Sequence, residues 1–281
     1  MSSNLEYYVR QAKSGDRQAL ETLVSQIQDK IYGLALRMLN NPQDAEDEGQ
    51  EILIKVITHL SNFREESAFT SWVYRIACNH LLTKRKQKND QMKMTFDLLA
   101  EVGFSQTEDH HALTISGPER GVLLEEVRMG CMQCMLSCLE KEMRIVFIFG
   151  EQYGVTSKEG AFILDITPEA FRKRLSRART LMQTFMMNHC GLVDEKKPCR
   201  CHIKAAQLVK QDQIPSGKNS IVKKAGVEKS REKLELHLKE LSEIDRTVAM
   251  YRNYPEYQSP DSFPTIVRDL IKSKQYSLFI D

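Results

Sequence analysis

The chain has 281 residues, of which 40 are basic, 38 are acidic and 41% are hydrophobic. This length predicts two domains with modest cores, and the near balance of charge means that the placement of charges matters more than their sum. No apolar run approaches the roughly 20 residues that span a bilayer, and the first residues lack the basic flank and apolar core of an export signal. We therefore expect a cytoplasmic protein whose seven cysteines stay reduced rather than form disulfides.

Two amphipathic helices are predicted within the first sixty residues. The first covers residues 16–39, begins at the capping residue Asp16 and gathers its apolar residues on one face. The second covers about 42–60 and can bury that face, while the stretch from Asp44 to Glu51 holds five acidic residues and no basic one. The helix dipole favours acidic residues at a helix start, so the cluster needs no partner to explain it.

The stretch 62–86 combines aromatic residues with a basic helix end. A loop opening on Phe63 leads to a hydroxyl cap at Ser67 and to a helix that carries the only tryptophan, Trp72, before the basic residues 84–86. Aromatic rings stack on unpaired bases and cations neutralise phosphates, so this surface suits single-stranded nucleic acid. Residues at helical spacing are expected in the core instead: Phe69, Val73, Ile76, Ala77 and Leu81. The residues off that stripe are the better candidates for contact: Trp72, Tyr74, Arg75 and Asn79.

Helical periodicity is lost between about 87 and 121. We expect a flexible linker there, with at most a short helix near 94–99. The neighbouring His110 and His111 could bind a metal, but two loop histidines without a matched partner are more often simply exposed.

A second helical unit begins near residue 118. Its three cysteines, Cys131, Cys134 and Cys138, share a helix face with aliphatic residues, which favours buried thiols over a zinc knuckle.

A helix over 156–165, a tight turn and a second helix over 167–187 predict a helix-turn-helix. Thr167 caps the second helix, Pro168 takes its first position and Glu169 complements its dipole. Four apolar residues are expected to pack that helix: Phe171, Leu175, Ala178 and Leu181. The remaining polar and basic residues can then face the major groove and its phosphates: Arg172, Lys173, Ser176, Arg177 and Arg179.

The residues after 187 form a cysteine-containing extension. Cysteines and histidines surround a Pro/Gly loop, and the candidate metal ligands are Cys190, Cys199, Cys201 and His202. Zinc, a redox thiol pair and plain structural cysteines all fit this pattern. A basic linker over 204–229, an amphipathic helix over 227–251 and a short helix over 265–272 follow. This last part either regulates by folding back onto a domain or caps exposed apolar surface.

The order of residue types between Asp44 and Asn79 resembles the second conserved region of bacterial RNA polymerase sigma factors, above all the extracytoplasmic-function group. The residues that carry the resemblance are Asp44, Ala45, Glu46, Asp47, Gln50, Glu51, Phe63, Arg64, Ser67, Phe69, Trp72, Tyr74, Arg75, Ile76, Ala77 and Asn79. The stretch 139–182 resembles the fourth region of the same factors, although 151–165 matches loosely. The Cys-Gly-Leu-Val and Cys-Arg-Cys segments resemble an extension found after that region in a subset of them.

The resemblance implies an all-α fold, in which two small helical domains are joined by a flexible linker and followed by a partly helical extension. The expected ranges are 1–88 for the first domain, 89–120 for the linker, 121–188 for the helix-turn-helix domain and 189–281 for the extension. It implies core RNA polymerase and promoter DNA as partners, an anti-sigma factor or another regulator as a further one, and no membrane. It implies neither an enzymatic activity nor a cofactor. The zinc considered above rests on the Cys and His residues and not on the resemblance.

The resemblance also implies contact residues. The expected contacts to core polymerase are Asp47, Gln50 and Glu51. The expected contacts to the melted −10 element are Asn62, Phe63, Arg64, Phe69, Trp72, Tyr74, Arg75, Asn79, Lys84 and Arg85. The expected contacts to the −35 element are Thr167, Glu169, Arg172, Lys173, Ser176, Arg177 and Arg179.

Two other functions compete with this interpretation. A helix-turn-helix repressor or activator would use only 139–187 and leave polymerase untouched, so binding to core polymerase separates it from a sigma factor. A metalloenzyme built on the Cys and His residues ranks behind both, because the sequence shows no nucleophile with a base at useful spacing and no phosphate-binding Gly-rich loop.

Overall fold

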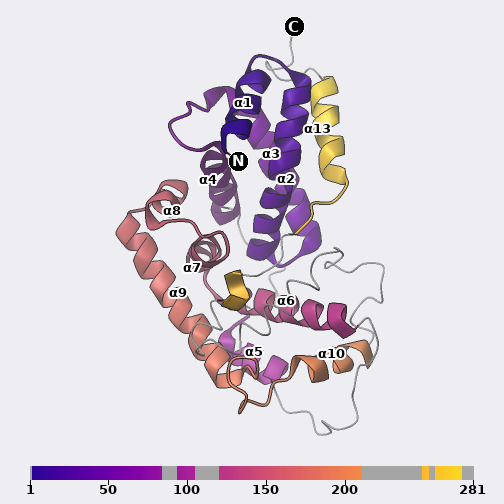
Figure 1. Ribbon diagram of the computed structural model, residues 1–281, viewed down its shortest axis with the longest axis vertical. Helices are drawn as coiled ribbons and strands as arrows, with labels where there is room; N and C mark the ends of the chain where they lie inside the picture. Colours follow the sequence, from indigo (N-terminus) through magenta and orange to yellow (C-terminus); the bar gives the residue numbers. More distant parts are fainter. Residues whose placement is uncertain (1, 84–93, 105–119, 211–248, 253–256, 274–281) are drawn as a thin grey trace. The chain divides into compact units, whose positions relative to one another are not determined.

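The computed structural model describes residues 2–83, 94–104, 120–210, 249–252 and 257–273 (Figure 1). The regular structure of these ranges is helical, apart from one isolated β-bridge between Cys190 and Cys199, which confirms the expected all-α class. Within the same ranges no helix is both long and apolar enough to span a membrane. The chain divides into two compact units. The first unit comprises 1–89, 155–172 and 256–281, and the second comprises 90–154 and 173–255. The domain boundaries expected at 88, 120 and 188 stay a prediction.

The first unit is built on two helices that begin and end where the sequence places its caps. Helix α2 (Arg17–Leu39) starts after Asp16, whose carboxylate accepts hydrogen bonds from the backbone N–H groups of Gln18 and Ala19 at 2.9 and 3.1 Å. It ends at Asn40, which adopts the left-handed conformation with φ of 55°. Helix α3 (Pro42–Thr58) begins directly afterwards, so the two helices pack closely and bury their facing apolar residues.

Helices α1 (Ser2–Lys13) and α4 (Phe69–Thr83) complete this part of the first unit, with a 3₁₀ turn, η1 (Leu60–Asn62), between α3 and α4. Helix α1 fixes the loop that precedes α4. Lys13 donates from Nζ to the carbonyl of Phe63 at 2.8 Å, and Arg10 pairs with Glu65 at 3.2 Å. The loop before α4 is therefore held at two points by the N-terminal helix.

The predicted cap of α4 at Ser67 is wrong. The Ser67 hydroxyl donates to the carbonyl of Ala68 at 3.4 Å instead of accepting from the helix. The carbonyl of Ala68 accepts the first helical hydrogen bonds, from the N–H groups of Ser71 and Trp72. Helix α4 therefore starts with backbone hydrogen bonds to Ala68 and without a side-chain cap from Ser67. A cap would require the serine oxygen to accept from a backbone N–H group of the first turn.

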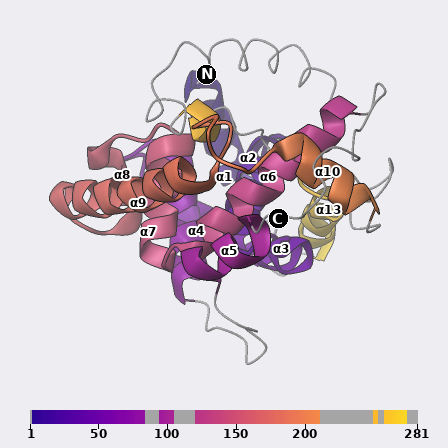
Figure 2. The same ribbon diagram turned by 90° about the horizontal axis from the view of Figure 1, so that it is seen from below.

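Two segments distant in sequence also belong to the first unit. Helix α8 (Ser157–Leu164) packs against α4, and helix α13 (Ser262–Ser273) lies along α2 and α3 (Figures 1 and 2). The short final helix predicted over 265–272 is therefore present and begins earlier, at Ser262. The amphipathic helix predicted over 227–251 lies outside the described residues, except for the helical residues 249–251.

The second unit contains α5 (Phe96–Phe104), α6 (Arg120–Cys138), α7 (Lys141–Phe147), the π-helix η2 (Ile148–Gln152) and α10 (Cys201–Lys210). It also holds most of α9 (Pro168–His189). The apolar run 145–149 is fully buried, as its composition predicts. The short helix expected near 94–99 is α5, while His110 and His111 lie outside the described residues.

Candidate polymerase-binding and nucleic-acid-binding surfaces

The acidic face of α3 is only partly open to a partner. Asp47 and Glu51 are exposed and lie one helical turn apart, and Asp47 accepts a hydrogen bond from Gln43 at 3.2 Å. Gln50 is half-buried and donates from Nε2 to the hydroxyl of Ser262, also at 3.2 Å. Two of the three expected polymerase contacts are therefore accessible, and the third is engaged by the C-terminal helix.

Another acidic residue of the same cluster has a structural role that the sequence does not reveal. Glu48 pairs with Nε2 of His80 on α4, and the opposite ring nitrogen of His80 lies 2.6 Å from Nζ of Lys55. Both Glu48 and His80 are largely buried, so the contact ties α3 to α4. Nothing in the spacing of these residues indicates that they meet.

The aromatic residues before and within α4 form one cluster. The Trp72 ring lies 5.4 Å from the ring of Phe63 and 5.7 Å from that of Phe69, measured between centroids. Phe63 and Phe69 are 2% and 1% exposed, whereas Trp72 is only half-buried. The two phenylalanines support the Trp72 ring from the core, and part of that ring stays accessible to solvent. Asn62 and Arg64 are exposed beside them.

The first half of α4 is engaged by α8. Arg75 pairs with Asp165 at 3.0 Å and its guanidinium lies 5.2 Å above the ring of Phe162. Ser71 donates to Glu159 at 2.8 Å. A phosphate contact by Arg75 therefore requires α8 to release that side chain. Of the other expected contacts, Tyr74 is half-buried, Asn79 is exposed, and Lys84 and Arg85 lie outside the described residues.

The predicted helix-turn-helix is present as α8 and α9. The Thr156 hydroxyl accepts from the N–H of Glu159, which caps α8, and Thr167 caps α9 by accepting from the N–H of Ala170 at 3.1 Å. The turn between them includes Asp165 with φ of 55°. Gly160 of α8 permits close packing, because a Cβ at this position would collide with the Phe171 ring.

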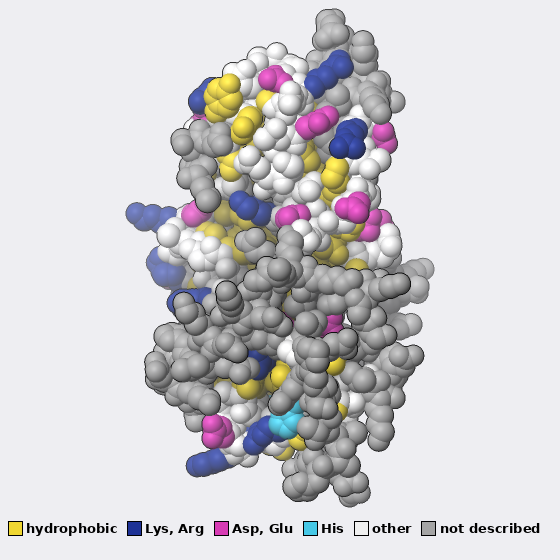
Figure 3. Space-filling model, turned by 45° about the vertical axis from the view of Figure 1, so that its right-hand side comes forward, with side chains coloured by type: hydrophobic (Ala, Val, Ile, Leu, Met, Phe, Trp, Pro, Cys, Tyr) yellow, Lys and Arg dark blue, Asp and Glu magenta, His cyan; other side chains and the backbone are white. Residues whose placement is uncertain are grey.

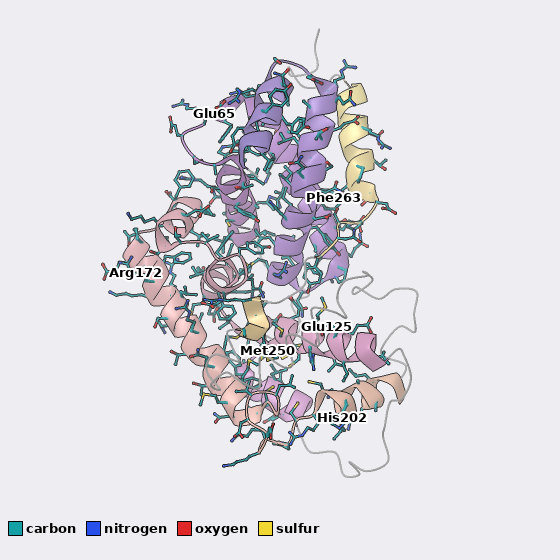
Figure 4. The ribbon with its side chains drawn as sticks, viewed as in Figure 1. Glu65, Glu125, Arg172, His202, Met250 and Phe263 are labelled. Atoms are coloured by element: carbon teal, nitrogen blue, oxygen red, sulfur yellow. The ribbon has the colours of Figure 1, made fainter. Side chains whose placement is uncertain are left out.

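The exposed face of α9 carries most of the residues expected at DNA. Arg172, Lys173, Ser176 and Arg177 are exposed, and Arg172 donates to Ser157 at 3.4 Å (Figure 4). The helix start with Thr167 and Glu169 is exposed as well. On the face drawn in Figure 3, basic and acidic side chains are interspersed over the described surface. Arg172, Lys173 and Arg177 form a local group of basic side chains, and such a group attracts phosphates even where the net charge of a protein is near zero.

Two details of α9 differ from the prediction. Arg179, expected at DNA, is paired within the protein: its Nε donates to the carboxylate of Glu151 at 2.5 Å, and Glu151 is 1% exposed. Leu181, expected to pack the helix, is 41% exposed, and Met182 is buried in its place. The buried face of α9 runs from Phe171 through Ala178 to Met182, since 3.6 residues complete a turn and the register favours residue 182 over 181.

The cysteines of the second unit lie close to one another. Burial raises the pKa of the Cys131 thiol, and nearby Cys190, Cys199 and Cys201 raise it further. Burial, followed by other thiols, also raises the pKa of Cys199 to about 12 and that of Cys201 to about 11. The thiols are therefore protonated at neutral pH. His202 is exposed, and among the described residues no three His, Cys, Asp or Glu side chains form a group that could hold a metal ion.

Comparison with known proteins finds a matching family for two stretches of the chain. A family model described as Sigma-70 region 2 matches residues 23–90, and one described as Sigma-70, region 4 matches residues 129–182. The RNA polymerase sigma-H factor of Pseudomonas aeruginosa is 33% identical over 175 residues, which cover 61% of this chain and 88% of that protein.

Two further relatives agree. The ECF RNA polymerase sigma-E factor of Escherichia coli K12 is 32% identical over 176 residues, covering 61% of this chain and 88% of the relative. The ECF RNA polymerase sigma-E factor of Haemophilus influenzae is 30% identical over 180 residues, covering 62% and 91%. The chain therefore belongs to the extracytoplasmic-function group of the sigma-70 family of RNA polymerase sigma factors, which direct core RNA polymerase to promoters.

Proposed function

We propose that this sigma factor uses three surfaces, one to bind core polymerase and two to recognise the promoter. The α3 face of Asp47, Gln50 and Glu51 binds core polymerase, the exposed face of α9 reads the −35 element, and Trp72 captures a base of the melted −10 element. The protein acts in the cytoplasm, catalyses no reaction itself, and is a target for an anti-sigma factor or a similar regulator. The observation that carries the proposal is the exposed row of basic side chains on the capped second helix of a helix-turn-helix.

The α9 surface has the geometry that major-groove recognition needs. Arg172, Lys173, Ser176 and Arg177 recur at positions i, i+1, i+4 and i+5, so they share one face, while Phe171 and Ala178 are buried on the other. A recognition helix places its N-terminal residues against base edges and its flanking cations against phosphates. Arg172, Lys173 and Arg177 lie in the first half of α9, where this contact is expected.

The Trp72 surface has the chemistry that melting needs. Unstacking a base costs a few kcal/mol, and stacking the freed base on an aromatic ring returns about 1–3 kcal/mol. Two buried rings hold the tryptophan in place, so it loses little conformational freedom when a base stacks on it. The exposed Asn62 and Arg64 are close in sequence to the supporting Phe63 and can contact the adjoining strand.

Transcription in vitro with purified core polymerase tests the proposal. We expect the full chain to support initiation from its promoter, and the pair Asp47→Ala and Glu51→Ala to weaken binding to core polymerase. Glu21→Ala, which removes an exposed acid from α2, serves as the matched control and should bind normally. A chain that binds promoter fragments but leaves core polymerase unbound would support the rival, a helix-turn-helix regulator that acts alone.

Zinc at the cysteine-containing extension is a separate proposal. The candidate ligands are Cys190, Cys199, Cys201 and His202. The support is that the three thiols lie near one another, and three cysteines with one histidine are a common zinc ligand set. The side chains would have to move to bind a metal ion, given that they form no such group now. Metal analysis of the full chain, compared with the pair Cys199→Ser and Cys201→Ser, tests it directly.

A further inference from the structure

The C-terminal tail, defined here as the described residues 257–273, is attached to α2 at its start. The Tyr257 ring lies beneath the guanidinium of Arg37, 4.7 Å from ring centroid to Cζ, and the two residues are 5% and 3% exposed. Ser259 donates from both its backbone N–H and its hydroxyl to Oδ1 of Asp29, at 2.9 and 2.6 Å. After these contacts, α13 packs against both α2 and α3.

Phe263, labelled in Figure 4, lies at the start of α13 and contacts both α2 and α3. The residue is 0% exposed and its ring packs edge to face on Tyr32 of α2, with centroids 6.0 Å apart. On the α3 side it lies against Gly49, where a Cβ would stand 2.6 Å from the ring. Glycine inside a helix is unfavourable compared with alanine, so its presence here is explained by the room that the Phe263 ring needs. The absence of a side chain at Gly49 therefore allows the Phe263 ring to approach α3 closely.

Ser262 extends this contact to the face that we assign to polymerase. Its hydroxyl donates to Oε1 of Glu46 at 2.5 Å and accepts from Nε2 of Gln50 at 3.2 Å. Gln50 is one of the three expected polymerase contacts and lies on the same side of α3 as Asp47 and Glu51. A polymerase segment that reaches all three residues would have to replace Ser262 at Gln50 and pass beside α13.

We propose that the tail competes with core polymerase for α3, so that the docked tail keeps the factor in a state of low polymerase affinity. The inference rests on the proposed function of the α3 face. Two ligands that share one contact residue bind in competition, and the one built into the chain lowers the apparent affinity for the other. If the tail is docked nine-tenths of the time, the apparent Kd for polymerase rises about tenfold.

The test uses full-length variants that release the tail without altering α3. Phe263→Ala removes the ring that packs against Gly49, and Tyr257→Ala removes the contact with Arg37 on α2, away from the polymerase face. Asp269→Ala, an exposed position of α13, is the matched control. Hydrogen exchange of residues 257–263 confirms release, and the Kd for core polymerase is measured for every variant.

We expect both release variants to bind core polymerase about tenfold more tightly than the unaltered chain, and Asp269→Ala to bind as the unaltered chain does. If hydrogen exchange shows that the tail is released in both release variants and all four proteins still bind core polymerase equally, the proposed competition is overturned and the proposed function stands. Weaker binding by both release variants would overturn it too, because the tail would then be part of the polymerase interface. Absence of polymerase binding by all four would overturn the proposed function along with it.

Discussion

Arg179 donates from Nε to the buried carboxylate of Glu151, which separates it from the other basic residues of α9. Removing it leaves Glu151 with Arg252, whose Nε lies 3.8 Å from Oε2. We expect Arg179→Ala to cost about 2 kcal/mol of unfolding free energy. A fully buried pair would cost roughly 3–5 kcal/mol, but the Arg179 side chain is 41% exposed. Urea unfolding measures the loss.

Arg177 is the matched comparison for Arg179, because we expect Arg177 to contact DNA rather than to stabilise the fold. Its side chain is exposed on α9, so Arg177→Ala should change the unfolding free energy by less than about 0.5 kcal/mol. It should weaken binding to the −35 element and lower the salt slope of that binding by about one unit, as the loss of one phosphate contact does. An unchanged slope would place the DNA contact elsewhere.

Gly160 should tolerate no side chain. Gly160→Ala forces the new Cβ against the Phe171 ring, so α8 and α9 must separate and the helix-turn-helix should lose about 1–3 kcal/mol. Gly130 in α6 is the control, because a Cβ there meets nothing within 4 Å. Gly130→Ala should stabilise the protein by about 0.5–1 kcal/mol through helix propensity. Thermal unfolding of the two variants should therefore move in opposite directions.

Trp72 should affect melting more than duplex binding. Trp72→Ala removes the half-buried ring that two buried phenylalanines support, and open-complex formation should fall about 5- to 150-fold if one stacked base is lost. Permanganate reactivity of unpaired thymines measures the open complex. Trp72→Phe should keep part of the activity, and a template with a pre-melted −10 segment should reduce the defect. A normal open complex with Trp72→Ala would remove the ring from the mechanism.

The clustered thiols predict a pH dependence of stability. The pKa of Cys199 is raised from 9.0 to about 12 and that of Cys201 to about 11, chiefly by burial. Below about pH 9 the thiols are protonated in both folded and unfolded chains, so their contribution to stability is fully present. As the pH rises from about 9 through 11 and 12, the unfolded chain loses these protons first and the unfolding free energy falls.

Urea unfolding at several pH values between 8 and 11 measures this effect. The pair Cys199→Ala and Cys201→Ala lacks both thiols, so its unfolding free energy should fall less steeply over the same range. An identical slope for the unaltered chain would show that other groups cause the loss.

Local signals in the sequence account for much of the fold. The Asp16 cap and the apolar periodicity after it predict α2, and Thr167, Pro168 and Glu169 predict the start of α9, because capping depends on atoms only two or three residues apart. The all-α class and both sigma regions follow from the same kind of information. Ser67 shows the limit of local signals, because a hydroxyl at the right sequence position caps a helix only if its oxygen accepts from the backbone N–H groups of that helix.

The sequence by itself therefore determined which helices form and which family the chain belongs to, because periodicity, caps and motif spacing are written within short stretches. Only the tertiary structure decided which side chains are accessible to a partner. Gln50 meets Ser262 across 212 residues, and Arg179 meets Glu151 across 28, distances at which spacing carries no information. Such contacts depend on how separate helices pack, and packing fixed that Arg177 is exposed while Arg179, two positions away, is bound to a buried acid.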